Sequence, residues 1–471
     1  MKQFFFSLFF AGITILSANG QNFDPVLTQT LQNKVVALKT QYNLKGISAS
    51  VVIPGQGTWA GVAGSSTTIP QNAVSSDMLF GIGSCTKNFT AALILKLQEQ
   101  GLININNPVS TYISNLSSYP NINGSVTIRQ LLNHTSGIGE YTGDSYFWYY
   151  TWTNRSYLFT NDNILSTIGQ QQFAPGTNWN YCNSNFYLLG IIIQNVTQTD
   201  LLTAYNNYLL SPLSLGNVFL GAWETIPANV SFAHGWGTNM VTYQTVDVLL
   251  DSRNSIWSGA GSAGCLVSTA EDLAKWAQLL FNGSVINQTS VNEMTTFNSN
   301  NYGLGCYKLT SAGRTTWGHI GNIPGYTAIF IYDPACNVSS SILVNQENVD
   351  ITTIMSSFYQ VIVDDYCNVT SAGNDINTNN NTTSFGSFPN PFNYSTEIEF
   401  FIPEETDASI AIYDISGNIV KTFSLNKVSP GTQSIVWYGD DNEGNLVADG
   451  IYISRLTTRN DVVLIKMLIN R

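Results

Sequence analysis

The chain has 471 residues, of which 44% are hydrophobic and only 10% are charged, and its formal net charge is -12. This length exceeds one ordinary domain core and predicts two or three globular domains. Contact with a nucleic-acid backbone needs a basic patch, which 18 Lys+Arg against 30 Asp+Glu do not suggest, so we expect no nucleic-acid partner.

The first twenty residues are typical of a secretory signal peptide. Lys2 precedes an apolar stretch from Phe4 to Leu16, and Ala18-Asn19-Gly20 places small residues where a signal peptidase cleaves. An apolar run of about thirteen residues is too short to span a bilayer. The residue after the expected cleavage site is Gln21 and not a cysteine, so no lipid anchor is expected. We therefore expect removal of residues 1–20 and export of the protein through the periplasm to the medium or the cell surface.

Ser84 and Lys87 are the first residues that indicate chemistry. They stand three residues apart at the start of an apolar, helix-periodic run from Asn88 to Gln100, so their side chains share one helix face and the amine can take the hydroxyl proton. The run from Met78 to Gly83 predicts a strand end and a sharp turn before the helix. Ser424 and Lys427 have the same spacing in a predicted strand and turn, where no helix start supports them.

Aromatic side chains are concentrated between residues 141 and 159. They could form a wall over a cleft that prefers apolar or sugar-bearing acyl groups, or they could pack a helical lobe, and the sequence favours neither reading. The residues are Tyr141, Tyr146, Phe147, Trp148, Tyr149, Tyr150, Trp152, Tyr157 and Phe159.

Tyr181 and Asn183 follow a Pro175-Gly176 turn and precede an apolar helix from Phe186 to Gln194. This context predicts a rigid loop beside a cleft. A phenol near an ammonium loses its proton more easily and can then shuttle it. The amide of Asn183 is suited to bind a substrate carbonyl.

His319, Gly321 and Asn322 lie between two segments that read as paired strands, Arg314 to Thr316 and Tyr326 to Tyr332. We expect Gly321 to let a substrate backbone approach the strand edge closely.

In this order and at these separations, the motifs resemble those of the serine beta-lactamase and D-Ala-D-Ala carboxypeptidase superfamily. The nearest branch is the group of class C beta-lactamases, carboxypeptidases and related esterases, and the resemblance runs from about residue 25 to 365. The supporting motifs are Ser84-x-x-Lys87, Leu131-Leu132-Asn133-His134-Thr135-Ser136-Gly137, Tyr181-x-Asn183, the segment from Ser262 to Leu273, and His319-x-Gly321.

The resemblance implies a serine hydrolase that forms an acyl-enzyme. Ser84 would attack a carbonyl, Lys87 and Tyr181 would move protons, and Asn183 would bind the acyl side chain. The backbone N–H groups of Ser84 and Asn322 would form the oxyanion hole. His319 would replace a lysine of the beta-lactamase strand motif, with Gly321 completing that motif. His134 matches a family loop and is expected to be structural.

Ile320 departs from the pattern of the carboxypeptidases. They commonly have a threonine at this position, whose hydroxyl helps to bind the terminal carboxylate of the substrate. Isoleucine cannot donate that hydrogen bond, and an unpaired carboxylate in a cleft costs about 1–3 kcal/mol or more. The sequence therefore favours ester or amide substrates with an uncharged leaving side.

Residues 371–387 are rich in Asn, Ser and Thr and are predicted to form a linker. From residue 388 to 471, short alternating segments such as 398–402 and 409–413 are broken by glycines, which predicts a small immunoglobulin-like β-sandwich. The preceding domain is assigned to residues 21–370.

The tail also carries motifs that resemble the sorting domain of type IX secretion substrates. The resemblance implies passage across the outer membrane by that machinery, usually with removal of the tail. The alternative is an immunoglobulin-like accessory domain that binds substrate or cell wall. The motifs are Phe388-Pro389-Asn390-Pro391-Phe392-Asn393, Ile412-Tyr413-Asp414, Trp437, Gly450-Ile451-Tyr452 and Lys466-Met467.

Six cysteines allow 15 complete sets of three disulfides, and chain geometry favours one particular pair. A six-residue strand and an eleven-residue helix cover roughly 20 Å and 16 Å, which brings Cys367 back to Cys336. Cys85 and Cys182 follow residues that must converge in one cleft, so they are a second expected pair, or Cys85 is a buried free thiol. Cys265 and Cys306 would form the third pair.

Taken together, the sequence predicts an α/β hydrolase domain with an antiparallel sheet flanked by helices and a helical lobe, followed by an all-β domain. We expect a monomer that acts on a small-molecule or peptide substrate. Three histidines and the absence of a C-x-x-C motif predict no metal site, and no cofactor is expected. The alternatives are a peptidoglycan D-Ala-D-Ala carboxypeptidase or D-aminopeptidase, and a penicillin-binding module that no longer hydrolyses.

Overall fold

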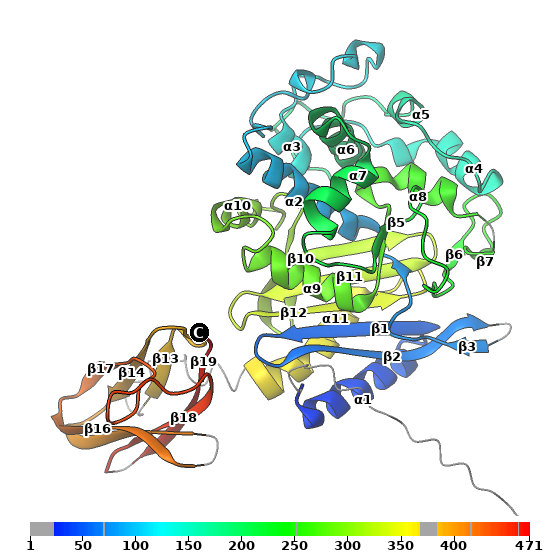
Figure 1. Ribbon diagram of the computed structural model, residues 1–471. Helices are drawn as coiled ribbons and strands as arrows, with labels where there is room; N and C mark the ends of the chain where they lie inside the picture. The colour runs from blue at the N-terminus through cyan, green and yellow to red at the C-terminus, as the bar shows by residue number, and fades with distance from the viewer. Residues whose placement is uncertain (1–22, 69–70, 251, 368–383, 415–416, 460) are drawn as a thin grey trace, which may run out of the picture. The chain divides into compact units, whose positions relative to one another are not determined.

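The computed structural model describes residues 23–68, 71–250, 252–367, 384–414, 417–459 and 461–471 (Figure 1). The chain divides into two compact units, residues 1–355 and 356–471. The predicted signal peptide, and the predicted linker as far as residue 383, lie outside the described residues. Among the described residues no helix is long and apolar enough to cross a membrane.

The first unit is built on a seven-stranded antiparallel sheet with the order β3-β2-β1-β12-β11-β10-β9. The predicted pairing of the strands around His319 is confirmed in part. β10 pairs with β11, with Trp317 opposite Tyr332 and Ile323 opposite Tyr326, but His319 lies within β10, and residues 314–316 pair with β9. The strands are β1 Gly46–Ile53, β2 Gly57–Thr68, β3 Gln71–Ala73, β9 Tyr307–Ser311, β10 Arg314–Ile323, β11 Tyr326–Asp333 and β12 Val338–Val344.

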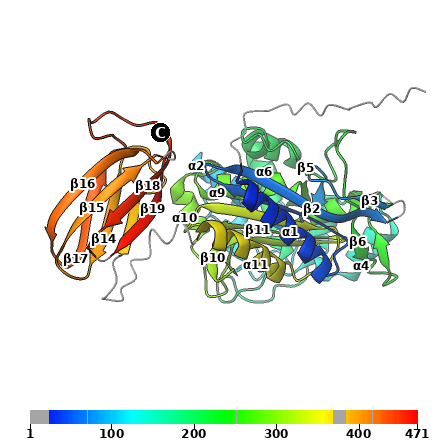
Figure 2. The ribbon, with the colours of Figure 1, turned by 90° about the horizontal axis from the view of Figure 1, so that it is seen from below.

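Helices cover both faces of this sheet. On one face Gln32 of α1 donates to the carbonyl of Val62, and on the other Ser339 and Ser341 of β12 donate to carbonyls of α9. Figure 2 shows α1 across β2 from below. The helices of the first unit are α1 Pro25–Gln41, α2 Thr86–Glu99, α3 Ile128–Leu132, α4 Ser145–Thr153, α5 Asn161–Ser166, α6 Asn183–Thr197, α7 Leu201–Tyr205, α8 Asn254–Ala260, α9 Ala270–Phe281 and α10 Gln288–Met294.

The long helix α2 is central to the helical lobe. Its residues from Thr86 to Leu95 are all buried, because the helix is surrounded by α6, β10 and the short turn Gly261–Ala263. Its buried polar group Asn88 is fully engaged: the amide donates to the carbonyl of Gly305 at 3.0 Å and accepts from the Trp276 indole at 2.9 Å. These bonds offset the cost of burying a polar side chain and fix the helix against α9.

A second, three-stranded sheet leads the chain into α2. It has the order β4-β8-β5, with β4 at Phe80–Gly81, β8 at Leu266–Ser268 and β5 at Val218–Leu220. The predicted strand end before Ser84 is thus β4. A separate pair consists of β6 Trp236–Thr238 and β7 Thr245–Asp247.

The second unit contains the predicted β-sandwich, with sheets in the orders β13-β14-β17 and β16-β15-β18-β19. Tail motif residues form part of its core, since the Trp437 ring lies 5.5 Å from the Phe392 ring and 5.3 Å from the Tyr452 ring. The strands are β13 Ser384–Phe388, β14 Thr396–Ile402, β15 Thr406–Tyr413, β16 Ile419–Val428, β17 Gly431–Trp437, β18 Gly450–Thr457 and β19 Val462–Ile469. The strand β13 thus lies partly within the predicted linker, residues 371–387. The remaining helix, α11 Ile351–Ile362, contains the boundary between the units.

One of the three expected disulfides is confirmed. Cys336 and Cys367 are disulfide-bonded, whereas the other four cysteines are free and buried. The pairing of Cys85 with Cys182 is wrong, and the alternative of a buried free thiol at Cys85 is confirmed. Each sulfur contacts a different backbone carbonyl: Cys85 Sγ lies 3.4 Å from that of His319, and Cys182 Sγ lies 3.4 Å from that of Ile138. The pairing of Cys265 with Cys306 is also wrong.

Candidate active site

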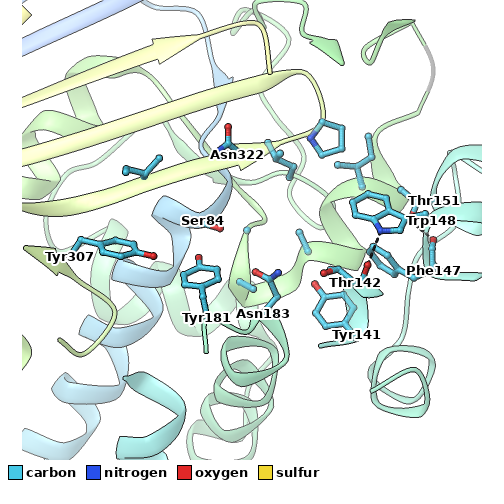
Figure 3. Close-up of a pocket in the computed structure, with 17 residues that line it drawn as sticks. Ser84, Tyr141, Thr142, Phe147, Trp148, Thr151, Tyr181, Asn183, Tyr307 and Asn322 are labelled. Atoms are coloured by element: carbon cyan, nitrogen blue, oxygen red, sulfur yellow. Dashed lines mark hydrogen bonds between the residues drawn. The ribbon is translucent and has the colours of Figure 1, made fainter. Parts of the chain in front are cut away.

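A cavity of about 480 Å³ opens beside Ser84, between the helical lobe and β10 (Figure 3). None of the described residues that line it is Asp, Glu, Lys, Arg or His, so its wall is neutral. The lining residues are Ser84, Tyr141, Thr142, Phe147, Trp148, Thr151, Tyr181, Asn183, Ile256, Ala260, Ala263, Gly264, Tyr307, Ile320, Asn322, Ile323 and Pro324.

Ser84 lies in the short turn Gly83–Cys85, directly before α2. Gly83 has a φ of +49°, and a Cβ there would stand 2.7 Å from backbone atoms of Asn322. A Cβ on Gly321 would stand 1.9 Å from the carbonyl oxygen of Ile82. The two glycines therefore let the turn that carries Ser84 pack directly on the backbone of β10. The Ile82 carbonyl thus gives a reason within the protein itself for a glycine at position 321, and the approach of a substrate backbone to this strand edge stays a prediction.

Lys87 is fully buried beside Ser84. Its Nζ lies 2.9 Å from Ser84 Oγ, 2.8 Å from Asn183 Oδ1 and 2.8 Å from the carbonyl oxygen of Ala263. Burial, which disfavours the charged form, lowers the pKa of Lys87 to about 7. Near neutral pH a large share of the molecules therefore holds a neutral amine within hydrogen-bond distance of the serine hydroxyl.

Tyr181 is also brought to the site, with its hydroxyl hydrogen-bonded to Ser84 and its ring centroid 4.9 Å from Lys87 Nζ. Figure 3 shows its hydroxyl pointing toward Ser84. Burial nevertheless raises the pKa of Tyr181 well above its usual range. The raised pKa of Tyr181 does not support easy loss of its phenol proton, whereas the lowered pKa of Lys87 makes the amine the better candidate for the base.

Asn183 is the first residue of α6, and its side chain reaches Lys87 while lining the cavity. Asn322 lines the cavity from β10, and its Oδ1 accepts from Thr327 Oγ1 at 3.1 Å. Because the backbone of Gly83 lies against that of Asn322, the chain segments that carry the two expected oxyanion donors are adjacent.

His319 does not line the cavity, although it lies in β10 as expected. Its side chain is buried on the other side of the strand, where Nδ1 donates to the Ile320 carbonyl at 2.7 Å and Nε2 accepts from the Tyr302 hydroxyl at 3.0 Å. Burial lowers the pKa of His319 to about 3, so the ring is neutral. Strand alternation explains the placement, since Ile320 and Asn322 face the cavity and His319 and Gly321 face away.

His134, expected to be structural, supports Tyr181. Its φ is 62°, and its Nδ1 accepts hydrogen bonds of 3.2 Å from the Cys182 backbone and the Asn185 side chain. The His134 ring centroid lies 4.4 Å from that of Tyr181. Burial lowers the pKa of His134 well below its usual range, which makes it a neutral packing group.

The aromatic segment, residues 141–159, contributes both to the cavity wall and to the packing of the helical lobe, and its preference for particular acyl groups stays a prediction. Tyr141, Phe147 and Trp148 line the cavity, and the Trp148 indole donates to the Thr142 carbonyl at 2.8 Å. Trp152 and Phe159 instead pack in the core of the lobe. The segment thus provides an aromatic wall built on a packed helix, α4.

Two residues at the site were missed by sequence reasoning. Tyr307 of β9 lines the cavity, with its ring stacked at 14° to that of Tyr181 and a centroid distance of 6.4 Å. Glu140 accepts hydrogen bonds from the backbone of Asn183 at 2.5 Å and of Thr142 at 3.0 Å. A lone carboxylate next to the His134 loop, in a chain with few charges, was the available signal for Glu140.

A group of potential metal ligands lies elsewhere among the described residues. Asp333, Cys336 and Cys367 have ligand atoms within 4.8 Å of one another. Both cysteines are disulfide-bonded and Asp333 pairs with Arg314, so the group offers no thiolate to a metal ion.

Two family profiles match the chain. The Beta-lactamase family matches residues 31–352, and the FlgD Ig-like domain matches residues 394–461. Protein flp of Staphylococcus aureus (strain N315) is 29% identical over 277 residues, which cover 56% of this chain and 52% of that protein. The match thus spans about half the length of this relative.

The chain is also similar in fold to solved structures. A D-stereospecific amidohydrolase from Streptomyces sp. is 28% identical, with a TM-score of 0.59 over 73% of this chain and 99% of that one. The D-amino acid amidase from Ochrobactrum anthropi SV3 complexed with L-phenylalanine amide shares the fold, with 23% identity and a TM-score of 0.62 over 72% and 99% of the two chains. With its profile match over more than half of its length, the chain belongs to the Beta-lactamase family.

Proposed function

We propose that this protein is an exported serine hydrolase that cleaves ester or amide bonds through an acyl-enzyme on Ser84. The observation that carries the proposal is the 2.9 Å contact between Ser84 Oγ and the buried Lys87 Nζ, whose pKa is lowered to about 7. A lysine that is partly neutral at physiological pH can act as a general base, whereas an ordinary lysine is protonated.

In the proposed acylation step, Lys87 takes the proton of Ser84 while Oγ bonds to the substrate carbonyl carbon. The carbonyl oxygen becomes an oxyanion, which the backbone N–H groups of Ser84 and Asn322 stabilise. When the bond to the leaving group breaks, the proton passes from Lys87 to the leaving atom, with the Tyr181 hydroxyl as a relay. Water then attacks the ester by the reverse path and releases the acid and free Ser84.

The neutral wall of the cavity supports uncharged substrates. At position 320 a free carboxylate on the leaving side would meet Ile320, whose side chain cannot donate a hydrogen bond. Simple esters and amino acid amides carry no such carboxylate, and the similarity to a D-stereospecific amidohydrolase supports amides as candidates. The alternatives are D-Ala-D-Ala carboxypeptidase or D-aminopeptidase action, or penicillin binding without turnover.

The test compares wild-type protein with Ser84→Ala on a fluorophosphonate probe, p-nitrophenyl butyrate, D-phenylalanine amide, nitrocefin and a D-Ala-D-Ala peptide. Ser424→Ala is the matched control, because Ser424 shares the Ser-x-x-Lys spacing but lies in β16 of the second unit. We expect covalent labelling and turnover in the wild type and in Ser424→Ala, and neither in Ser84→Ala. Labelling that persists in Ser84→Ala would exclude Ser84 as the nucleophile.

For the second unit we propose the type IX sorting role that its motifs resemble. Support comes from the tail motifs themselves, from the preceding signal-like segment and from the immunoglobulin-like class of the matched profile. Expression in a bacterium with and without a working type IX system tests the role. Dependence of the extracellular protein on that system would support it, and equal release from both strains would contradict it.

A further inference from the structure

Glu140 caps the N-terminus of α6, although it lies 43 residues before Asn183 in the sequence. The N-cap residue of α6, Cys182, makes no side-chain capping bond. Instead, Glu140 Oε2 accepts from the Asn183 backbone at 2.5 Å, and Oε1 accepts from Thr142 at 3.0 Å. A carboxylate at this position satisfies a free helix N–H and complements the positive end of the helix dipole.

This capping bond extends to the proposed base. The residue that Glu140 holds, Asn183, accepts from Lys87 Nζ at 2.8 Å, and Lys87 Nζ lies 2.9 Å from Ser84 Oγ. Glu140 is therefore linked to the serine hydroxyl through two intervening side chains. Because Glu140 does not line the cavity, it can affect the reaction only through this chain of contacts and through its charge.

The other titratable groups around Lys87 are neutral near pH 7. Burial raises the pKa of the thiols and phenols near Lys87, which keeps them protonated; these groups are Cys85 in the turn directly before α2, and Tyr181, Cys182, Tyr302 and Tyr307. Burial lowers the pKa of His134 and His319, which keeps both rings uncharged. The largest interaction that favours the charged form of Lys87 comes from Glu140. Without Glu140, the ammonium would lack its main compensating charge.

We propose that Glu140 is a positioning residue for the hydrolysis, which fixes Asn183 beneath the Lys87 amine and stabilises the ammonium that forms when Lys87 takes the Ser84 proton. This inference rests on the proposed function. The ammonium forms during acylation, so the Glu140 charge lowers the barrier of that step and does not merely strengthen substrate binding.

Glu140→Gln keeps the size of the side chain and removes its charge. We expect two effects together: the acid limb of kcat/KM moves to lower pH, because Lys87 loses a stabilising charge, and the plateau falls by up to about tenfold for each pH unit of that movement. The rate of fluorophosphonate labelling of Ser84 should show the same shift, because labelling also requires the amine to accept the proton.

Glu99→Gln is the matched control. Glu99 also accepts a backbone N–H, from Asn287 at 2.8 Å, but lies at the opposite end of α2 from Ser84. The acid limb of kcat/KM for Glu99→Gln should coincide with that of the wild type. Glu140→Asp, which keeps the charge on a shorter side chain, should leave the limb close to the wild-type position while lowering the plateau through the displaced Asn183.

The outcomes separate this inference from the proposed function. If wild-type Ser84 is not labelled, the proposed function fails. If it is labelled, and folded Glu140→Gln has an unshifted limb, or a limb shifted to higher pH, the role of Glu140 is overturned. If Glu140→Gln does not fold, Glu140→Asp decides: a fall in kcat larger than any rise in KM supports the role, and wild-type kinetics or a change confined to KM contradicts it.

Discussion

Gly321 lies so close to Ile82 that a Cβ on Gly321 would stand 1.9 Å from the Ile82 carbonyl oxygen. This contact joins β10, the strand next to the edge strand β9, to the turn before α2, so it sets the position of Ser84 relative to Asn322. The protein's own backbone therefore requires a glycine at this position.

Gly321→Ala is therefore expected to lower the free energy of unfolding by about 1–3 kcal/mol or more and to slow labelling of Ser84, because the strand and the turn must separate. Thermal unfolding and fluorophosphonate labelling rates measure the two effects. Gly216→Ala is the control, since a Cβ at Gly216 meets nothing within 4 Å. Equal labelling rates in wild type and Gly321→Ala would contradict the positioning argument.

The pH dependence of the reaction should follow Lys87. Because its pKa is lowered to about 7, the neutral amine is lost below that pH, and kcat/KM should fall by about tenfold per pH unit on the acid side. A pH-rate profile with an uncharged ester checks this. A profile that stays flat down to pH 5 would show that Lys87 is not the base.

Lys87 should also make stability depend on pH. Its folded pKa is lower than its usual value of 10.5, so between pH 7 and 10.5 the unfolded chain binds the extra proton, and the Lys87 contribution to stability increases with pH. Urea unfolding of wild type and Lys87→Met at pH 7 and pH 9 tests the sign. The free energy of unfolding of the wild type, relative to that of Lys87→Met, should be higher at pH 9 than at pH 7.

Ile320 should govern the response to a leaving group with a carboxylate. Ile320→Thr adds a hydroxyl that faces the cavity, and a hydrogen bond to a charged group contributes about 1.5–3 kcal/mol, so D-Ala release relative to ester hydrolysis should rise roughly tenfold or more. Ile320→Val, which changes size without adding a donor, should not raise this ratio. Efficient release of D-Ala by the wild type would argue against the specificity proposed above.

Trp148 should set the preference for large acyl groups. Trp148→Ala removes an aromatic part of the cavity wall, so kcat/KM for a phenylacetyl ester should fall about tenfold relative to an acetyl ester. Tyr146→Ala on the same helix is the control, because Tyr146 is 69% exposed and does not line the cavity. If the ratio of kcat/KM for the two esters is the same in Trp148→Ala as in the wild type, the aromatic wall does not determine the acyl preference.

Local spacing explains which parts of the site the sequence predicts correctly. Ser84 and Lys87 meet because residues three apart on a helix share a face, whatever surrounds the helix. The same kind of local rule places His319. Alternate residues of a strand face opposite sides, so a cavity that Ile320 and Asn322 face does not receive the His319 side chain.

Other features depend on contacts that no local pattern contains. Glu140 meets Asn183, and Tyr307 meets Tyr181, only because the tertiary fold brings distant loops and strands together. The cysteine pairs show the same limit. Chain geometry was sufficient for Cys336 and Cys367, but the directions of the Cys85 and Cys182 side chains could not be inferred from the convergence of Ser84 and Tyr181.

The four free thiols have a practical consequence for experiments on this protein. All of them are buried, and burial raises the pKa of each, so the native protein presents no reactive thiolate at neutral pH. Maleimide reagents should leave the folded chain unmodified. A single cysteine introduced on the surface can then carry a fluorophore or spin label without removal of any native cysteine, and labelling that appears during urea titration reports directly on opening of the core.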